Sequence, residues 1–440
     1  MFKYLLLLFV LISLCTCNDS LQKAFLTDIP AFPVGEGVTS YQRPITLVRN
    51  CRSPLSYIPD TAQLNATPIK YIRVNFHVMR RADGTGNFDE EIGVKEIKNT
   101  LRKANYMLAN NVKMKLPVGN NTPVLPIQYR YVLTPQPDDP NDDGIYFHND
   151  EELYYLIAKG PGQNNYNRNV FQKYGVQKDT VLNIFVMAYH ADSLQSVSYK
   201  PRVRGIGFSN FCKVTTWYHQ ACPESQELCK ASFSKYDLDY RHTNLNHEIG
   251  HTIGLRHAWG SDGCDDTPHH PNCWGKGAPP CDVEVSNNIM DYNAAPKAWS
   301  PCQIGMAHYR FARKNSSIRK LLVPTWCEFK EDKTVVIRDS VVWRGAKDLE
   351  GHLIVESGAS LTLQCRLSLP AGGKLIVRPG ARLVLDGATL ENACGEQWAG
   401  IEVQEQKKKT GEVFYINKAT ITDVANPVHL AKAALQKQEK

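Results

Sequence analysis

Three histidines near the middle of the chain have the residue type and the spacing of a metal site. His247 and His251 are four residues apart, so in a helix their imidazoles lie on one face and can reach the same ion. His257 is the natural third ligand if the chain leaves the helix after His251. Gly254 permits this exit, because glycine adopts positive φ at little steric cost. Three protein ligands and one open position for water are typical of catalytic zinc.

Glu248 follows the first histidine directly and completes a hydrolytic pattern. It is offset from the two histidines on the same helix, where its carboxylate could take a proton from a water whose pKa the metal lowers. The alternative is a cluster of packed histidines without a metal. The third histidine makes a chance match rarer, so the pattern favours a zinc site with Glu248 as the base.

A second pattern lies downstream, where residues 288–292 read Asn-Ile-Met-Asp-Tyr. A three-histidine helix motif followed by such a methionine turn resembles the metzincin zinc metallopeptidases. The resemblance implies that Met290 forms an apolar floor beneath the metal and that Tyr292 approaches the zinc or the reacting carbonyl. It also implies an α+β catalytic domain, with a twisted mixed sheet and an active-site helix, that hydrolyses peptide bonds of protein substrates.

Within the metzincins, the residues between the two motifs resemble the pappalysin branch, the family of pregnancy-associated plasma protein A. The match lies in residues 263–268 and 300–306, and more weakly in residues 205–208, which resemble the edge strand that binds substrate. Relatives often carry a longer acidic stretch that binds calcium. Here the acidic loop either binds Ca²⁺ or is a solvated turn; its candidate ligands are Asp262, Asp265, Asp266 and Thr267.

The composition excludes several classes of protein. The chain has 440 residues, of which 42% are hydrophobic and 22% charged, so it can bury more than one core and is not disordered. The formal net charge is +7, but the basic residues are spread along the chain and form no long patch. No nucleic-acid partner is therefore expected.

The first 17 residues are predicted to be an export signal. Lys3 precedes an apolar run over residues 4–14, which is too short to span a bilayer but suits a signal peptide. The protein is therefore expected to be secreted or on the cell surface. Cys17 is a candidate for lipid modification, as in a bacterial outer-membrane lipoprotein, and simple cleavage and release is the alternative.

Eleven cysteines follow Cys17, and an odd number leaves one unpaired. In an oxidising compartment most of them should form disulfides. Cys51 stands apart within residues 18–67, which show little periodicity and are predicted to be a propeptide. Its thiolate could occupy the open zinc position and keep a zymogen inactive. The alternative is a structural disulfide or an idle thiol.

The catalytic domain is predicted over residues 68–326. Residues 71–78 are rich in β-forming side chains, and residues 94–108 carry apolar side chains at helical spacing. Further strands are expected near 127–133 and 181–188. This order of elements agrees with a mixed sheet followed by the active-site helix.

Residues 327–440 are predicted to form a separate all-β domain. Residues 351–363 are echoed by residues 373–385, an offset of 22 residues, with short β segments divided by glycine corners. A repeat of this length predicts a short parallel β-helix. The alternative is a small β-sandwich with two similar hairpins. A short helix within residues 428–435 is expected to close the last coil.

The sequence as a whole predicts an extracellular zinc endopeptidase of pappalysin type, made as a zymogen. A different class remains open: a surface protein whose C-terminal domain contacts glycan or matrix and whose peptidase domain is inactive.

Overall fold

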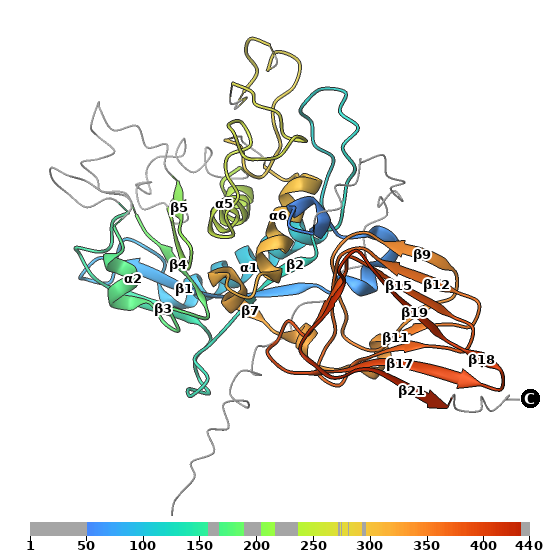
Figure 1. Ribbon diagram of the computed structural model, residues 1–440. Helices are drawn as coiled ribbons and strands as arrows, with labels where there is room; N and C mark the ends of the chain where they lie inside the picture. Colours follow the sequence, from blue (N-terminus) through green and yellow to red (C-terminus); the bar gives the residue numbers. More distant parts are fainter. Residues whose placement is uncertain are drawn as a thin grey trace, which may run out of the picture.

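The computed structural model describes residues 51–156, 167–188, 204–215, 236–271, 273, 275–279, 281–292 and 296–432. The architecture is mixed α/β, with parallel and antiparallel sheets and few helices (Figure 1). The predicted export signal, Cys17 and the segment before Cys51 lie outside the described residues, as do Cys222 and Cys229. No helix in the described ranges is both long and apolar enough to cross a bilayer.

A seven-stranded sheet forms one half of the molecule. Its order is β2-β1-β4-β6-β5, and β3 and β7 also pair with β1. The strands are β1 (Lys70–Arg80), β2 (Tyr129–Leu133), β3 (Ile145–Asn149), β4 (Leu182–Val186), β5 (Gly205–Gly207), β6 (Phe211–Val214) and β7 (Leu322–Val323). β5 pairs antiparallel with β6 at the end of the sheet, so its other edge pairs with no strand that the structure describes.

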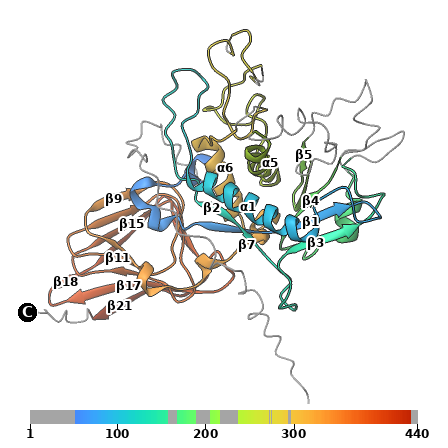
Figure 2. The same cartoon turned by 180° about the vertical axis from the view of Figure 1, so that it is seen from behind.

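Helices cover both faces of this sheet. They are α1 (Glu90–Ala109), α2 (Asn169–Tyr174), α5 (Tyr236–Thr252) and α6 (Pro301–Ala312). The even-numbered residues of β1 from Ile72 to Val78 share one core with α1, α5 and α6, whereas Met79 packs with α2 on the other face. Figure 2, from behind, shows α1 in the foreground with α5 and α6 beyond it.

Local sequence explains α1 well. Asp89 accepts a hydrogen bond from Ile92 N at 2.8 Å and caps the helix, and two glutamates occupy the first turn. Ile97, Leu101 and Leu108 are buried at helical spacing. The predicted helix over residues 94–108 therefore lies within the observed one.

The C-terminal half consists of three sheets whose strands pair mainly in parallel and follow one another in rotation. The first sheet contains β8 (Val335–Ile337), β11 (Leu353–Val355), β14 (Lys374–Val377), β17 (Trp398–Gln406), β18 (Lys409–Thr410) and β21 (Val424–Lys432). The second sheet contains β9 (Ser340–Trp343), β12 (Ser360–Leu363), β15 (Arg382–Asp386) and β19 (Glu412–Ile416). The third sheet contains β10 (Lys347–Asp348), β13 (Arg366–Ser368), β16 (Thr389–Glu391) and β20 (Thr420–Ile421). We refer to these three sheets as the stack, drawn in orange to red in Figure 1.

The register of the stack agrees with the repeat in the sequence. Leu353 pairs with Leu375, the offset expected from the repeat, and Gly358 and Gly380 turn equivalent corners with φ of +83° and +78°. Alternate side chains point inward and form a core that includes Leu361, Leu383 and Trp398. The end differs from the prediction: Val424–Lys432 is a strand paired with β17, so residues 428–432 do not form the helix expected within 428–435, whose last three residues lie outside the described ones.

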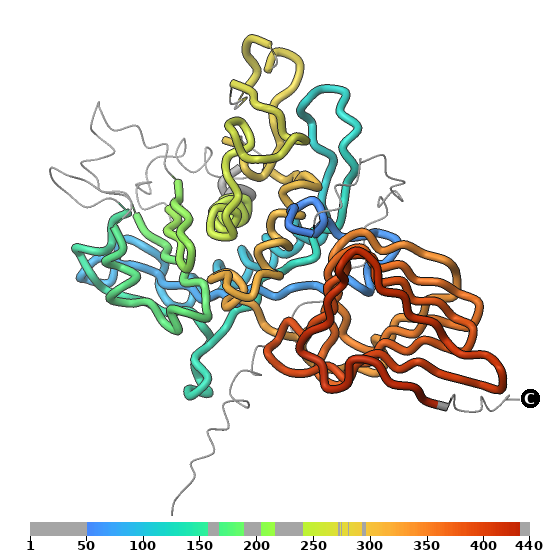
Figure 3. Tube along the Cα trace, viewed as in Figure 1, coloured from blue at the N-terminus to red at the C-terminus, as the bar shows by residue number. Residues whose placement is uncertain are grey.

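Residues 51–67 are packed into the fold, although they were predicted to be the end of a propeptide. Figure 3 shows them in blue between α6 and the first strands of the stack. They contain the 3₁₀ helices η1 (Pro54–Tyr57) and η2 (Thr61–Ala66). The carbonyl of Ser56 accepts a hydrogen bond from Ala346 N at 2.8 Å, and Ala66 is fully buried in the core of the stack. This segment therefore contacts both halves.

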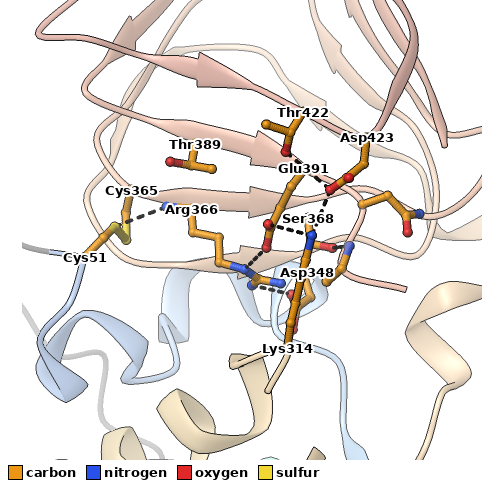
Figure 4. Close-up of polar contacts among 12 residues, drawn as sticks. Cys51, Lys314, Asp348, Cys365, Arg366, Ser368, Thr389, Glu391, Thr422 and Asp423 are labelled. Carbon is orange, nitrogen blue, oxygen red and sulfur yellow. Dashed lines mark hydrogen bonds and ion pairs between the residues drawn. A yellow bond between two sulfur atoms is a disulfide. The ribbon is translucent and has the colours of Figure 1, made fainter. Parts of the chain in front are cut away.

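Charged side chains and disulfides also join the two halves (Figure 4). Asp348 of β10 lies 2.7 Å from Lys70 of β1 and 2.8 Å from Arg366 of β13. Disulfides connect Cys327 to Cys394, and Cys51 to Cys365. The chain segment that connects the two halves contains three further 3₁₀ helices, η3 (Ser317–Leu321), η4 (Thr325–Cys327) and η5 (Glu331–Lys333).

Candidate metal centre

Helix α5 carries the first two histidines and the glutamate. Leu245 and Ile249 on this helix are fully buried in the core that the sheet shares with the helices, and His247 and His251 lie on a different face of the helix. The helix ends at Thr252, and the chain turns away at Gly254, whose φ is +89° and which lies against the guanidinium of Arg310. A Cβ there would lie 2.1 Å from that group, which is the end of a flexible side chain and could move, so it is the backbone conformation that favours glycine.

The structure brings the three predicted ligands together. Nε2 of His251 lies 3.1 Å from Nε2 of His247 and 3.1 Å from Nε2 of His257. Nδ1 of His247 donates to the carbonyl of Ile289 at 2.6 Å, and Nδ1 of His251 donates to the carbonyl of Leu255 at 2.9 Å. These two rings therefore carry their proton on Nδ1, and each Nε2 presents a lone pair to its neighbour.

Nitrogen lone pairs that converge in this way can bind a cation. Four ligands about 2.0–2.1 Å from one zinc ion at tetrahedral angles are separated by about 3.3 Å, close to the observed nitrogen distances. Burial lowers the pKa of His247 to about 3 and that of His257 to about 4, so both rings are neutral, as metal ligands must be. The residues present therefore fit a zinc ion.

Glu248 is buried beside this cluster. Burial raises the pKa of its carboxyl group to about 8. Asn244 donates to Oε1 at 3.5 Å, and Oε2 has no hydrogen-bond partner among the described residues. A carboxyl group with one free oxygen and a pKa near neutrality can both accept and return a proton.

The edge strand β5 lies directly against α5. A Cβ at Gly205 would be 2.4 Å from the carboxyl carbon of Glu248, and one at Gly207 would be 2.4 Å from the backbone carbonyl of Glu248. Residues 205–208, which weakly resemble a substrate-binding edge strand, thus contain β5 and lie beside the candidate base Glu248. The sequence did not reveal that the two glycines are needed for this close approach.

The methionine turn lies beneath the histidines. Met290 is fully buried, and its sulfur would be 2.5 Å from a Cβ at Gly250 of α5. Tyr292 is 40% exposed, and its ring centroid lies 4.5 Å from that of His257 and 6.1 Å from that of His247. The predicted floor and the predicted tyrosine therefore both lie at the cluster.

The acidic loop is held by protein donors. Asp262 accepts from Cys264 N at 3.0 Å and from Thr267 Oγ1 at 2.6 Å. Asp266 accepts from Ser300 Oγ at 2.7 Å and from Cys302 N at 2.9 Å, at the first turn of α6. All four oxygens of these two carboxylates thus have a protein partner. The loop is tied to α6 by the disulfide between Cys264 and Cys302.

The structure corrects the predicted cysteine switch. Cys51 forms a disulfide with Cys365 of the stack and does not lie beside the histidines. Among the described cysteines the free one is Cys212, which is buried in β6. Counting cysteines predicted that one is left over, and the packing of distant segments shows that Cys212 is the unpaired one among those that the structure describes.

Two residues were missed as parts of the site. His270 and Asp291 are buried, and His270 Nε2 lies 3.0 Å from Asp291 Oδ2. In the sequence His270 lies 13 residues after His257 and has no metal-ligand spacing to the three histidines. The one available signal was an acidic residue directly after Met290 in the predicted turn.

Comparison with solved structures finds mirolysin. The chain is similar to mature mirolysin of Tannerella forsythia in complex with a cleaved peptide, with 17% identity and a TM-score of 0.37 over 58% of this chain and 95% of that chain. It is also similar to mirolysin in complex with compound 9, with 18% identity and a TM-score of 0.38 over 58% of this chain and 96% of that chain. No protein-family model and no curated protein matches the sequence.

Proposed function

We propose that this protein is a zinc-dependent endopeptidase of metzincin type, from the pappalysin branch. The observation that carries the proposal is the convergence of three imidazole Nε2 atoms beside a buried carboxyl group with one free oxygen. His247, His251 and His257 would hold the metal. Zinc bound there would polarise a peptide carbonyl and lower the pKa of water.

The other residues of the site have distinct roles in this proposal. Glu248 accepts a proton from the attacking water at Oε2 and returns it to the leaving amine. The open edge of β5 binds the substrate backbone as an added strand. Tyr292, half exposed beside His257, can donate to the reacting carbonyl.

We also propose an arrangement of two units: a peptidase domain up to about residue 326, and the stack as a short parallel β-helix. The rotation of strands through three sheets and their parallel register support the β-helix. Because residues 51–67 pack against both units, any activating cleavage would fall before Cys51. Four disulfides among the described residues support a location outside the cytoplasm, either released or tethered through Cys17. We do not extend the proposal to calcium, because each carboxylate oxygen of Asp262 and Asp266 already accepts a hydrogen bond from a protein donor, and these bonds account for the fold of the loop.

The test compares Glu248→Gln with the wild type and with Glu396→Gln, a change at an exposed position of the stack. Cleavage of a random peptide library is followed by mass spectrometry, and bound zinc by elemental analysis. We expect Glu248→Gln to keep stoichiometric zinc and to lose activity by about 10²–10⁴-fold. Full cleavage in this variant would refute the role of Glu248. A wild type that binds zinc but cleaves no peptide would favour the surface-binding alternative.

A further inference from the structure

A buried polar cluster lies under the methionine turn, outside the set of metal ligands. His270 Nδ1 accepts a hydrogen bond from Cys273 N at 3.3 Å, so the proton of this imidazole is on Nε2. That Nε2 donates to Asp291 Oδ2 at 3.0 Å, and the same oxygen accepts from Ser286 Oγ. The side chains of His270 and Asp291 are 9% and 1% exposed.

The turn that this cluster holds is connected to two of the three ligands. The carbonyl of Ile289 accepts from Nδ1 of His247 at 2.6 Å, which orients that ring. The next carbonyl, of Met290, accepts from Ala258 N at 3.1 Å, directly after His257. Asp291 is the next residue in the chain. Its position therefore determines where two successive carbonyls point.

His270 also contacts the segment of the third ligand by a separate route. Its backbone N–H donates to the carbonyl of Trp259 at 3.3 Å, and Trp259 stacks on the ring of His257 with centroids 5.5 Å apart. The backbone of His270 thus binds the loop after His257, and its side chain binds the methionine turn. The Asp291 carboxylate also acts electrostatically on His257.

We propose that His270 and Asp291 are positioning residues of the metal centre, which hold His247 and His257 at the spacing that one ion requires. The inference rests on the proposed zinc site and extends it to a second layer of residues. Partners of this kind fix the orientation of ligand imidazoles, and their loss typically weakens metal affinity by about 10–100-fold. A residue that merely fills the core would affect stability and leave the affinity of the folded protein unchanged.

The test measures zinc affinity directly, by competition with a chromophoric chelator, in the full chain at a temperature where circular dichroism shows each variant folded. We expect His270→Ala to raise the dissociation constant for zinc by about 10–100-fold. His270→Gln can still donate an N–H to Asp291 and should recover most of the affinity. His269→Ala is the matched control, because this neighbouring histidine is exposed, and it should bind zinc like the wild type.

The outcomes separate this inference from the proposed function. If the wild type binds no zinc, the proposed function fails. If the wild type binds zinc and folded His270→Ala binds it equally well, only the positioning role fails. If His270→Ala does not fold, His270→Phe takes its place, since it keeps a ring at this buried position and removes the N–H that donates to Asp291. An unchanged dissociation constant in that variant would overturn the inference. In either variant, zinc-loaded protein should also show a lower kcat at nearly unchanged KM, because substrate contacts are retained.

Discussion

The close contact between β5 and α5 predicts a specific effect of adding one methyl group at Gly207. The new Cβ of Gly207→Ala would lie 2.4 Å from the backbone carbonyl of Glu248 and 2.6 Å from Cβ of His251. Ordinary contact begins at 3.4 Å, so strand and helix must separate by about 1 Å. Both opposing atoms belong to or adjoin the backbone, and no side-chain rotation can relieve the contact.

Two magnitudes follow from this displacement. Inserting a methyl group into a packed contact costs about 1–3 kcal/mol of folding free energy. A misplacement of about 1 Å between substrate and catalytic groups lowers the rate by about 10²-fold. We therefore expect kcat/KM on a peptide substrate to fall by about 10²-fold, with a modest loss of stability. Zinc affinity should change less than the rate, because the contact reaches Cβ of His251 and not its imidazole, and the edge strand can move away from the helix.

The assay measures kcat/KM, the free energy of unfolding in denaturant and bound zinc for Gly207→Ala. The matched control is Gly277→Ala, because a Cβ at Gly277 meets no atom within 4 Å. The control should resemble the wild type in all three measurements. Wild-type activity and stability in Gly207→Ala would show that the strand does not press on the helix, and the reasoning about substrate binding at β5 would fail with it.

Three further predictions concern stability and processing. Burial lowers the pKa of His77 from 6.5 to about 3, so this ring stabilises the fold fully above pH 6.5, and the contribution is lost as the pH falls from about 6.5 to 3. At about 1.4 kcal/mol per pKa unit, the loss of stability reaches roughly 4 kcal/mol at pH 3. In denaturant unfolding, the free energy of unfolding of His77→Gln should therefore depend less on pH between 6.5 and 3 than that of the wild type. An equal pH dependence in the two proteins would contradict the assignment. Asp348 lies between Lys70 and Arg366, two cations that are 2% and 9% exposed. Asp348→Ala should cost about 3–5 kcal/mol in the same assay, because buried Lys70 loses its carboxylate partner and Arg366 keeps only Glu391; a loss below about 1 kcal/mol would argue against it. Because Cys51 is bonded to the stack, N-terminal sequencing of the active protein should find its first residue before Cys51, and an active form that begins near residue 68 and lacks this segment would contradict the structure.

Local patterns in the sequence predicted several elements well. The β-rich stretch 71–78 lies within β1, and the helical periodicity of 94–108 lies within α1. These predictions succeeded because each depends on side chains that alternate between buried and exposed positions within one element. The repeat that begins at Gly351 likewise predicted the parallel register of β11 and β14.

Elements with weak local patterns were missed. β3, with sequence Ile-Tyr-Phe-His-Asn, is short and mostly half-buried, and β7 has only two residues. Both exist as strands because β1 is long enough to pair with more than one partner along each part of its length. The strand at Val424–Lys432 has the same cause, since pairing with β17 outweighs the helical spacing of its apolar residues.

The proposed chemistry could be predicted from the sequence, because the candidate ligands and the candidate base are at most ten residues apart and helical geometry relates His247, Glu248 and His251 directly. The surroundings of these residues depend on the tertiary structure. The bond between Cys51 and Cys365 spans 314 residues, and the pairing of His270 with Asp291 depends on how the loops fold back under α5. Such contacts follow from the packing of whole elements, and no local spacing of residue types encodes that packing.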